Sequence, residues 1–193
     1  MKKEGKDELV AEVVRRVLKE TGNASGREEN PGISLQPQIT LRLAVALIER
    51  IERLAEELGM RIVAAVSDAA GRPVAIHCMD GAYIGSFDVA LNKAYTAIAF
   101  QMSTARLGEL AAPGQPLYGI QQTNEGRIVI FGGGEPLTRM DLDGGSIADD
   151  SRSDEAASSR IIGAVGVSGG TAEQDTYLAA YARSIVKEVV SCL

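Results

Sequence analysis

Two short runs of β-branched and small apolar residues, 61–68 (RIVAAVSD) and 73–78 (PVAIHC), flank a turn at Ala69-Ala70-Gly71. Such runs favour extended strands. A connection this short joins neighbouring antiparallel strands, because a parallel crossover needs about a dozen residues or more. The sequence therefore predicts a β-hairpin at 61–78, and any fold proposed for the chain must contain it.

Amphipathic helices are predicted on either side of the hairpin. From Thr40, a suitable N-cap, apolar side chains recur at three- and four-residue spacing up to Gly59. Residues 86–102 and 103–111 are also predicted to be helical, and the capping-box pattern Thr171-x-x-Gln174 opens a final helix. Helices therefore both precede and follow the strands.

Three more strands are predicted, at 127–134 (RIVIFGGG), 134–141 (GEPLTRMD) and 160–170 (RIIGAVGVSGG). Residues 141–159 hold six acids and one arginine, which is typical of a solvated loop. Runs of strands bracketed by helices indicate an α+β fold with a five-stranded, mainly antiparallel sheet.

The first forty residues differ from the rest. Residues 7–20 (DELVAEVVRRVLKE) place apolar side chains on one helical face, and the next stretch is rich in Gly, Asn, Ser and Pro without periodicity. The sequence predicts an amphipathic helix in 1–21, a flexible linker at 22–37 and a folded domain at 38–193.

Composition excludes several classes of protein. The net charge of −6, with no Lys/Arg cluster, argues against nucleic-acid binding. No run of about 18 apolar residues exists, so no membrane association is expected. Cys78 and Cys192 lie far apart in sequence, which indicates neither a zinc knuckle nor a disulfide framework and favours a reducing cytoplasm.

His77, the only histidine, is the first candidate ligand. Adjacent strand residues face opposite ways, so Cys78 cannot share a pocket with His77, whereas Met79 lies on the same side. A structural zinc site lacks the other ligands. Two interpretations remain: a partly buried histidine bonded to backbone, or one axial imidazole to haem iron.

Lys93 and a set of glycines are further candidates. Lys93 lies mid-helix among small apolar residues and is expected to pair either with a ligand carboxylate or with Asp80 or Asp88. Strand positions without side chains admit a flat ligand or another backbone, which makes the glycines a candidate slot wall. The binding candidates are His77, Lys93, Gly163, Gly166 and Gly169.

Several stretches together resemble the GlcG/HbpS family, which also forms the C-terminal part of PduO-type corrinoid adenosyltransferases. The resemblance covers about residues 38–190 and rests on AVSDAAGRPVAIHCMDGA, DVALNKAYTAIAF, PGQPLYGI, GRIVIFGGGEPL and IIGAVGVSGGTAEQD. It implies a profilin-like sheet with helices on both faces, homo-oligomers (dimer, tetramer or octamer) and haem binding in several members. No ATP site is expected from the resemblance, and the acidic loop is longer than the family's hairpin.

Residues 7–20 are similar to the encapsulation peptides that recruit cargo to bacterial microcompartments, which implies a shell protein as partner. The leading hypothesis is a microcompartment protein that binds haem, or as second choice a corrinoid, through His77 and supports corrinoid or redox chemistry. The first alternative is an enzyme using Lys93, Tyr95 and Asp80 in acid–base roles. The second is a ligand-free cargo or shell adaptor.

Overall fold

The computed structural model describes residue 12, residues 38–143 and residues 161–193. The predicted helix at 7–20 apart from Glu12, the linker at 22–37 and residues 144–159 of the acidic loop lie outside the described residues. The described elements belong to one compact unit, Gln36–Leu193. Within them, no helix has the length and apolar character needed to cross a bilayer.

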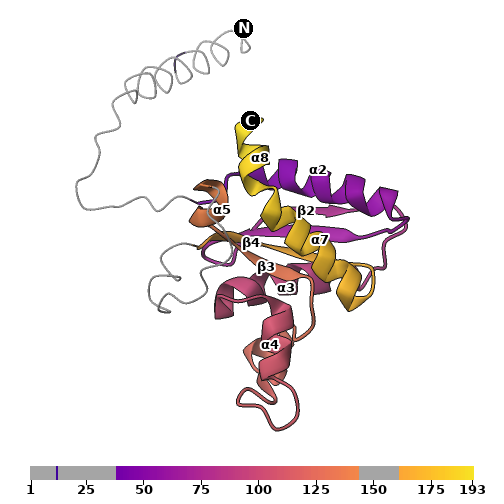
Figure 1. The fold of residues 1–193 in the computed structure, drawn as a ribbon, viewed down its shortest axis with the longest axis vertical. Helices are drawn as coiled ribbons and strands as arrows, with labels where there is room; N and C mark the ends of the chain where they lie inside the picture. Colours follow the sequence, from indigo (N-terminus) through magenta and orange to yellow (C-terminus); the bar gives the residue numbers. More distant parts are fainter. Residues whose placement is uncertain (1–11, 13–37, 144–160) are drawn as a thin grey trace, which may run out of the picture. The chain divides into compact units, whose positions relative to one another are not determined.

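A four-stranded antiparallel sheet in the order β2-β1-β4-β3 forms the centre of this unit (Figure 1). Its strands are β1 (Val63–Asp68), β2 (Pro73–Cys78), β3 (Gly134–Thr138) and β4 (Ile161–Ser168). The hairpin of β1 and β2 is confirmed. Its turn is closed by the Asp68 carboxylate, which accepts the N–H groups of Ala70 and Arg72 at 2.9 Å each.

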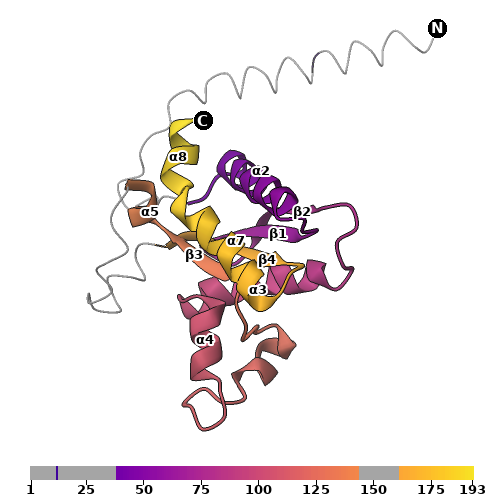
Figure 2. The ribbon, with the colours of Figure 1, turned by 45° about the vertical axis from the view of Figure 1, so that its right-hand side comes forward.

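Helices cover both faces of the sheet (Figures 1 and 2). On one face lie α2 (Leu41–Glu57) and α7 (Ala172–Ser184), and α8 (Val186–Ser191) continues from α7. On the other face lies α3 (Ser86–Phe100), followed by α4 (Thr104–Leu110). The short elements are α5 (Arg139–Asp143), η1 (Ile120–Gln122) and η2 (Asn124–Gly126).

Successive side chains of β1 point to opposite faces of the sheet, so this strand packs against helices on both faces. Its six residues are all buried. Ala64 and Val66 belong to the large core under α2 and α7, whereas Val63 and Ala65 pack with Ala90 of α3. A strand that is covered on both faces needs apolar residues at successive positions, which the sequence provides.

Side-chain caps fix where two helices begin. The hydroxyl of Thr40 accepts the N–H of Leu43 at 3.2 Å, as expected at the start of α2. At α7 the predicted capping box is confirmed, because Thr171 and Gln174 each accept the other's backbone N–H. Both helix starts therefore follow from local sequence alone.

The prediction of five strands is wrong, because residues 127–133 form no strand. Ile128 and Val129 are buried, as their apolar character predicts. However, the hydroxyl of Thr96 in α3 accepts the N–H of Val129 at 3.1 Å and approaches the carbonyl of Arg127 at 3.4 Å. The segment therefore packs along a helix, with a side chain taking the place of a neighbouring strand.

The predicted strand 134–141 is also shorter than expected. It ends at Thr138, whose N–H and hydroxyl both donate to the Asp141 carboxylate at 2.7 Å. This contact turns the chain into α5, so local capping ends the strand.

Candidate functional site

His77 lies on β2, at one edge of the sheet, and faces α2. It is opposite Ala64 in the β1–β2 register, and Ala64 belongs to the core under α2. Met79 packs against the same core, whereas Cys78 is opposite Val63 on the α3 side. The prediction that His77 and Cys78 point to opposite sides is therefore confirmed.

The partner of His77 is the carboxylate of Glu52 on α2. His77 Nδ1 lies 3.1 Å from Glu52 Oε1, and the two side chains are 35% and 25% exposed. With its proton on Nδ1, the imidazole donates to Glu52 and keeps the lone pair of Nε2 free. In histidines that bind metals through one ring nitrogen, a carboxylate bonded to the other ring nitrogen commonly fixes the orientation of the ring.

A cleft of about 700 Å³ opens between α2, the start of β1 and the end of β2. Its lining is mostly charged and carries more acidic than basic groups: Glu49, Glu52, Arg53, Glu56, Arg61, Cys78, Met79 and Asp80. Glu52 therefore lines this cleft and also bonds to His77. In the described part of the chain, no group of three or more His, Cys, Asp or Glu side chains could hold a metal ion.

Lys93 is fully buried in an internal ion pair. Its Nζ donates to Asp175 Oδ2 and to the carbonyl of Val167, both at 2.7 Å, and lies 4.9 Å from the centre of the Phe131 ring. Of the two interpretations of Lys93, the structure shows the internal ion pair, although the partner is neither Asp80 nor Asp88. Burial lowers the pKa of Lys93, and the ion pair with Asp175 opposes that shift.

The space beside the three glycines proposed as a slot wall is occupied by the protein's own atoms. A Cβ at Gly163 would lie 2.5 Å from the carbonyl oxygen of Ser67, and one at Gly169 would lie 2.5 Å from that of Arg61. At Gly166 it would clash with the backbone of α3. These glycines let the chain pack closely on itself, so within one copy they leave no room for a flat ligand.

The residues of the proposed enzyme are not brought together. Tyr95 stacks on Arg127, whose guanidinium carbon lies 3.9 Å from the ring centre, and its hydroxyl accepts from Asn124 at 3.3 Å. Asp80 lines the cleft beside α2, and Lys93 is buried with its own partners. Lys93, Tyr95 and Asp80 each have separate surroundings and do not form one catalytic group.

Comparison with known proteins identifies the family. A family model described as "Haem degrading protein HbpS-like" matches residues 39–148. The chain belongs to the HbpS-like family. An uncharacterized 15.0 kDa protein of the dhaT-dhaS intergenic region of Citrobacter freundii is 40% identical over 151 residues, which cover 78% of this chain and 94% of that protein.

Two other relatives of this HbpS-like chain have informative names. The corrinoid adenosyltransferase PduO of Citrobacter freundii is 32% identical over 89% of this chain, and the chain spans 44% of PduO. The crystal structure titled PduOC:Heme complex is 29% identical, with a TM-score of 0.63, and covers 76% of this chain and 94% of that one. The recognition of the family from sequence is therefore confirmed.

Sequence reasoning missed Glu52 and Asp175, the acidic partners of His77 and Lys93. Glu52 is one of several acids on α2, and Asp175 is one of two acids in the first turn of α7. Nothing local distinguishes them from solvated helix residues. Their partners lie 25 and 82 positions away, so only the tertiary structure pairs them in this HbpS-like protein.

Proposed function

We propose that this HbpS-like protein binds haem with His77 as an axial ligand to the iron. The contact between His77 Nδ1 and Glu52 carries the proposal, because it fixes the ring and keeps Nε2 available. A solved relative is a haem complex, which supports this ligand class. Haem when bound would supply an iron centre for redox chemistry.

The residues around His77 fit the polar ends of a haem better than its flat apolar part. Arg53 and Arg61 line the neighbouring cleft and match the negative charge of propionates. Glu49 and Glu56 line it as well and oppose that charge. The ring itself needs apolar cover, and Met79 is the main apolar side chain that the cleft offers.

Titration with haemin, followed by visible spectroscopy, tests the proposal. The wild-type chain should give a Soret band shifted from that of free haemin, and His77→Ala should lose the shift. Cys192→Ser is the control, since Cys192 is exposed and does not line this cleft, and it should keep the band. An unshifted wild-type spectrum, or a His77→Ala spectrum equal to that of wild type, would refute His77 ligation.

A corrinoid is the second choice of ligand. The PduO relatives are named corrinoid adenosyltransferases, and a corrinoid can also take an imidazole as axial ligand. The same variants titrated with a cobalamin would show which tetrapyrrole His77 prefers. If the cobalamin spectrum changes only with variants that retain His77, and no variant changes the haemin spectrum, then the ligand is a corrinoid and not haem.

We also propose that residues 7–20 recruit the protein to a bacterial microcompartment through a shell protein, where it supports corrinoid or redox chemistry. The support is the amphipathic pattern of this segment and the similarity of the domain to PduO. Deleting residues 1–21 should abolish co-localisation of a fluorescent fusion with shells and leave haem binding intact. Recruitment of the truncated fusion would contradict this part of the proposal.

A further inference from the structure

The carboxylates of two acidic residues share one guanidinium where β3 ends and α5 begins. Arg183 of α7 lies with Nε 3.2 Å from Asp141 Oδ1 and with Nη1 3.7 Å from Glu135 Oε2. The side chains of Arg183, Glu135 and Asp141 are 26%, 13% and 6% exposed. Three charged groups from α7, β3 and α5 therefore meet in mostly buried positions, and the carboxylates outnumber the cation.

The two carboxylates are bound unequally. Asp141 also accepts the N–H and the hydroxyl of Thr138 at 2.7 Å each, so both of its oxygens have partners. The contact of Glu135 with Arg183 is longer, and the described residues provide its carboxylate with no closer partner. When two carboxylates compete for one cation, the buried and weakly bound one takes up a proton more readily.

The pKa of Glu135 follows this geometry. Burial raises the pKa above its ordinary value of 4.5; Arg183 opposes the rise and the negative charge of Asp141 adds to it. The folded chain therefore takes up this proton before the unfolded chain does as the pH falls. The resulting stability is fully present below pH 4.5 and is lost as the pH rises through the raised pKa.

We propose that Glu135, Asp141 and Arg183 form a pH-sensitive latch that holds α5 more firmly against the sheet as the pH falls below neutrality. Protonation of Glu135 removes its repulsion of Asp141 and leaves Arg183 to Asp141 alone. Asp141 ties α5 to β3 through Thr138 and to α7 through Arg183. α5 also packs Leu142 against the core under α2 and α7, so a firmer hold on α5 steadies that edge of the core.

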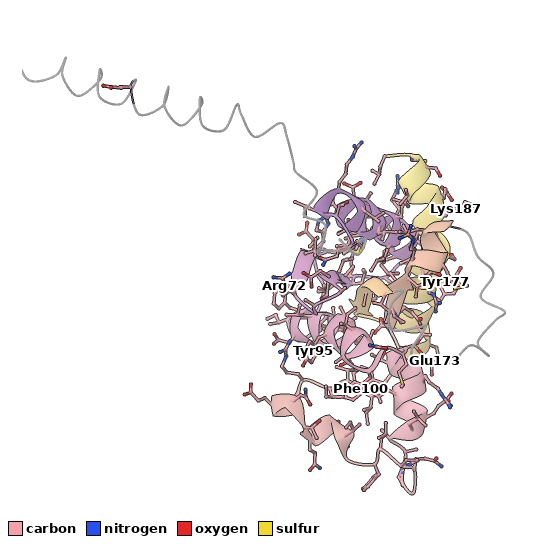
Figure 3. All side chains as sticks on the ribbon, turned by 90° about the vertical axis from the view of Figure 1, so that its left-hand side faces the viewer. Arg72, Tyr95, Phe100, Glu173, Tyr177 and Lys187 are labelled. Carbon is pink, nitrogen blue, oxygen red and sulfur yellow. The ribbon has the colours of Figure 1, made fainter. Side chains whose placement is uncertain are left out.

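The elements packed against β3 and α5 carry other charged groups, and β4 carries none. Three ion pairs account for most of them: Lys93 with Asp175, Arg106 with Glu109, and Glu188 with Arg50. Asp88 and Glu173 lie in the first turns of α3 and α7, whereas Arg183 lies in the last turn of α7. Arg139 of α5 and Lys187 of α8 have interactions of their own. Figure 3 shows Lys187 on α8, at the end of the body where α8 packs against α5.

Hydrogen exchange at the Thr138 amide, corrected for its intrinsic rate, measures how firmly the latch is closed, because this N–H donates to Asp141. In the wild type, protection should rise between about pH 7 and about pH 5, by up to about tenfold for each unit of the rise in pKa. Glu135→Gln carries a neutral side chain of the same shape, so its protection should not depend on pH. Glu188→Gln is the matched control, because Glu188 is 59% exposed in its pair with Arg50, and it should respond as the wild type does.

Wild-type protection that stays constant or falls toward acid pH would overturn the proposal, and so would a full pH response in Glu135→Gln. A response lost equally in Glu188→Gln would assign it to overall charge and would also overturn the latch. Carboxyl-carbon NMR titration of the wild type is a second measurement, which serves even where Glu135→Gln does not fold. Glu135 should titrate above 4.5, and titration at or below that value would refute the latch. None of these measurements involves haem, so they are independent of the function proposed for His77.

Discussion

Two pairs of a basic side chain with a carboxylate join distant parts of this chain, and they differ in burial. Lys93 and Asp175 lie 2.7 Å apart with side chains 0% and 4% exposed, whereas His77 and Glu52 lie 3.1 Å apart and are 35% and 25% exposed. From the sequence, both basic residues were candidates for ligand binding as well as for ordinary packing. Burial makes the first pair part of the packing, whereas the second pair remains partly exposed to solvent.

The surroundings of the two pairs explain this difference. Around Lys93 the chain closes tightly because Gly133 and Gly134 lack side chains; a Cβ at Gly133 would lie 2.7 Å from the lysine Nζ. Around His77, no other strand of the described residues flanks β2, which is the edge of the sheet. Close backbone packing thus buries one pair, and the edge of the sheet exposes the other.

The largest effect is expected from Asp175→Ala. The change leaves the Lys93 ammonium buried without its counter-charge, which costs about 3–5 kcal/mol in unfolding free energy. Urea denaturation measures it. Asp80→Ala, at an exposed carboxylate, is the control and should stay within about 0.5 kcal/mol of wild type. Equal stability of the two variants would mean that the buried pair contributes little.

A smaller loss is expected from Gly166→Ala. The added Cβ would lie 2.6 Å from the backbone nitrogen of Ala94 and closer still to the carbonyl of Ala90, so α3 must move away from β4. Overpacking of this kind costs about 1–3 kcal/mol. Gly85→Ala is the matched control, because a Cβ there has no atom within 4 Å. Thermal unfolding that ranks the two variants the other way would contradict close helix–sheet packing.

The smallest effect on stability is expected from Glu52→Gln. A partly exposed hydrogen bond between an imidazole and a carboxylate contributes about 0.5–1.5 kcal/mol, so the unfolding free energy should change little. Haem affinity should nevertheless fall about 10–100-fold, because the amide holds the imidazole less firmly in the ligating state. Parallel denaturation and haemin titrations check both halves. If Glu52→Gln lost much stability but kept its haem affinity, the His77–Glu52 pair would be a packing contact and not part of a ligand site.

Local sequence accounted for the elements whose signals are local. Spacing and residue type predicted the hairpin turn at Ala69-Ala70-Gly71, the caps at Thr40 and Thr171 and the alternation of faces along β2. The segment 127–133 was mistaken for a strand because its apolar residues are buried, and burial by a helix gives the same pattern as burial in a sheet.

The sequence by itself determined the α+β class, the hairpin, the family and the fact that His77 and Cys78 face opposite sides of β2. Tertiary structure alone decided that Glu52 meets His77, that Asp175 meets Lys93 and that the glycines of β4 face the chain's own backbone. The physical reason is distance along the chain. Caps and turns form between residues a few positions apart, whereas these pairs form only after helices and sheet have packed.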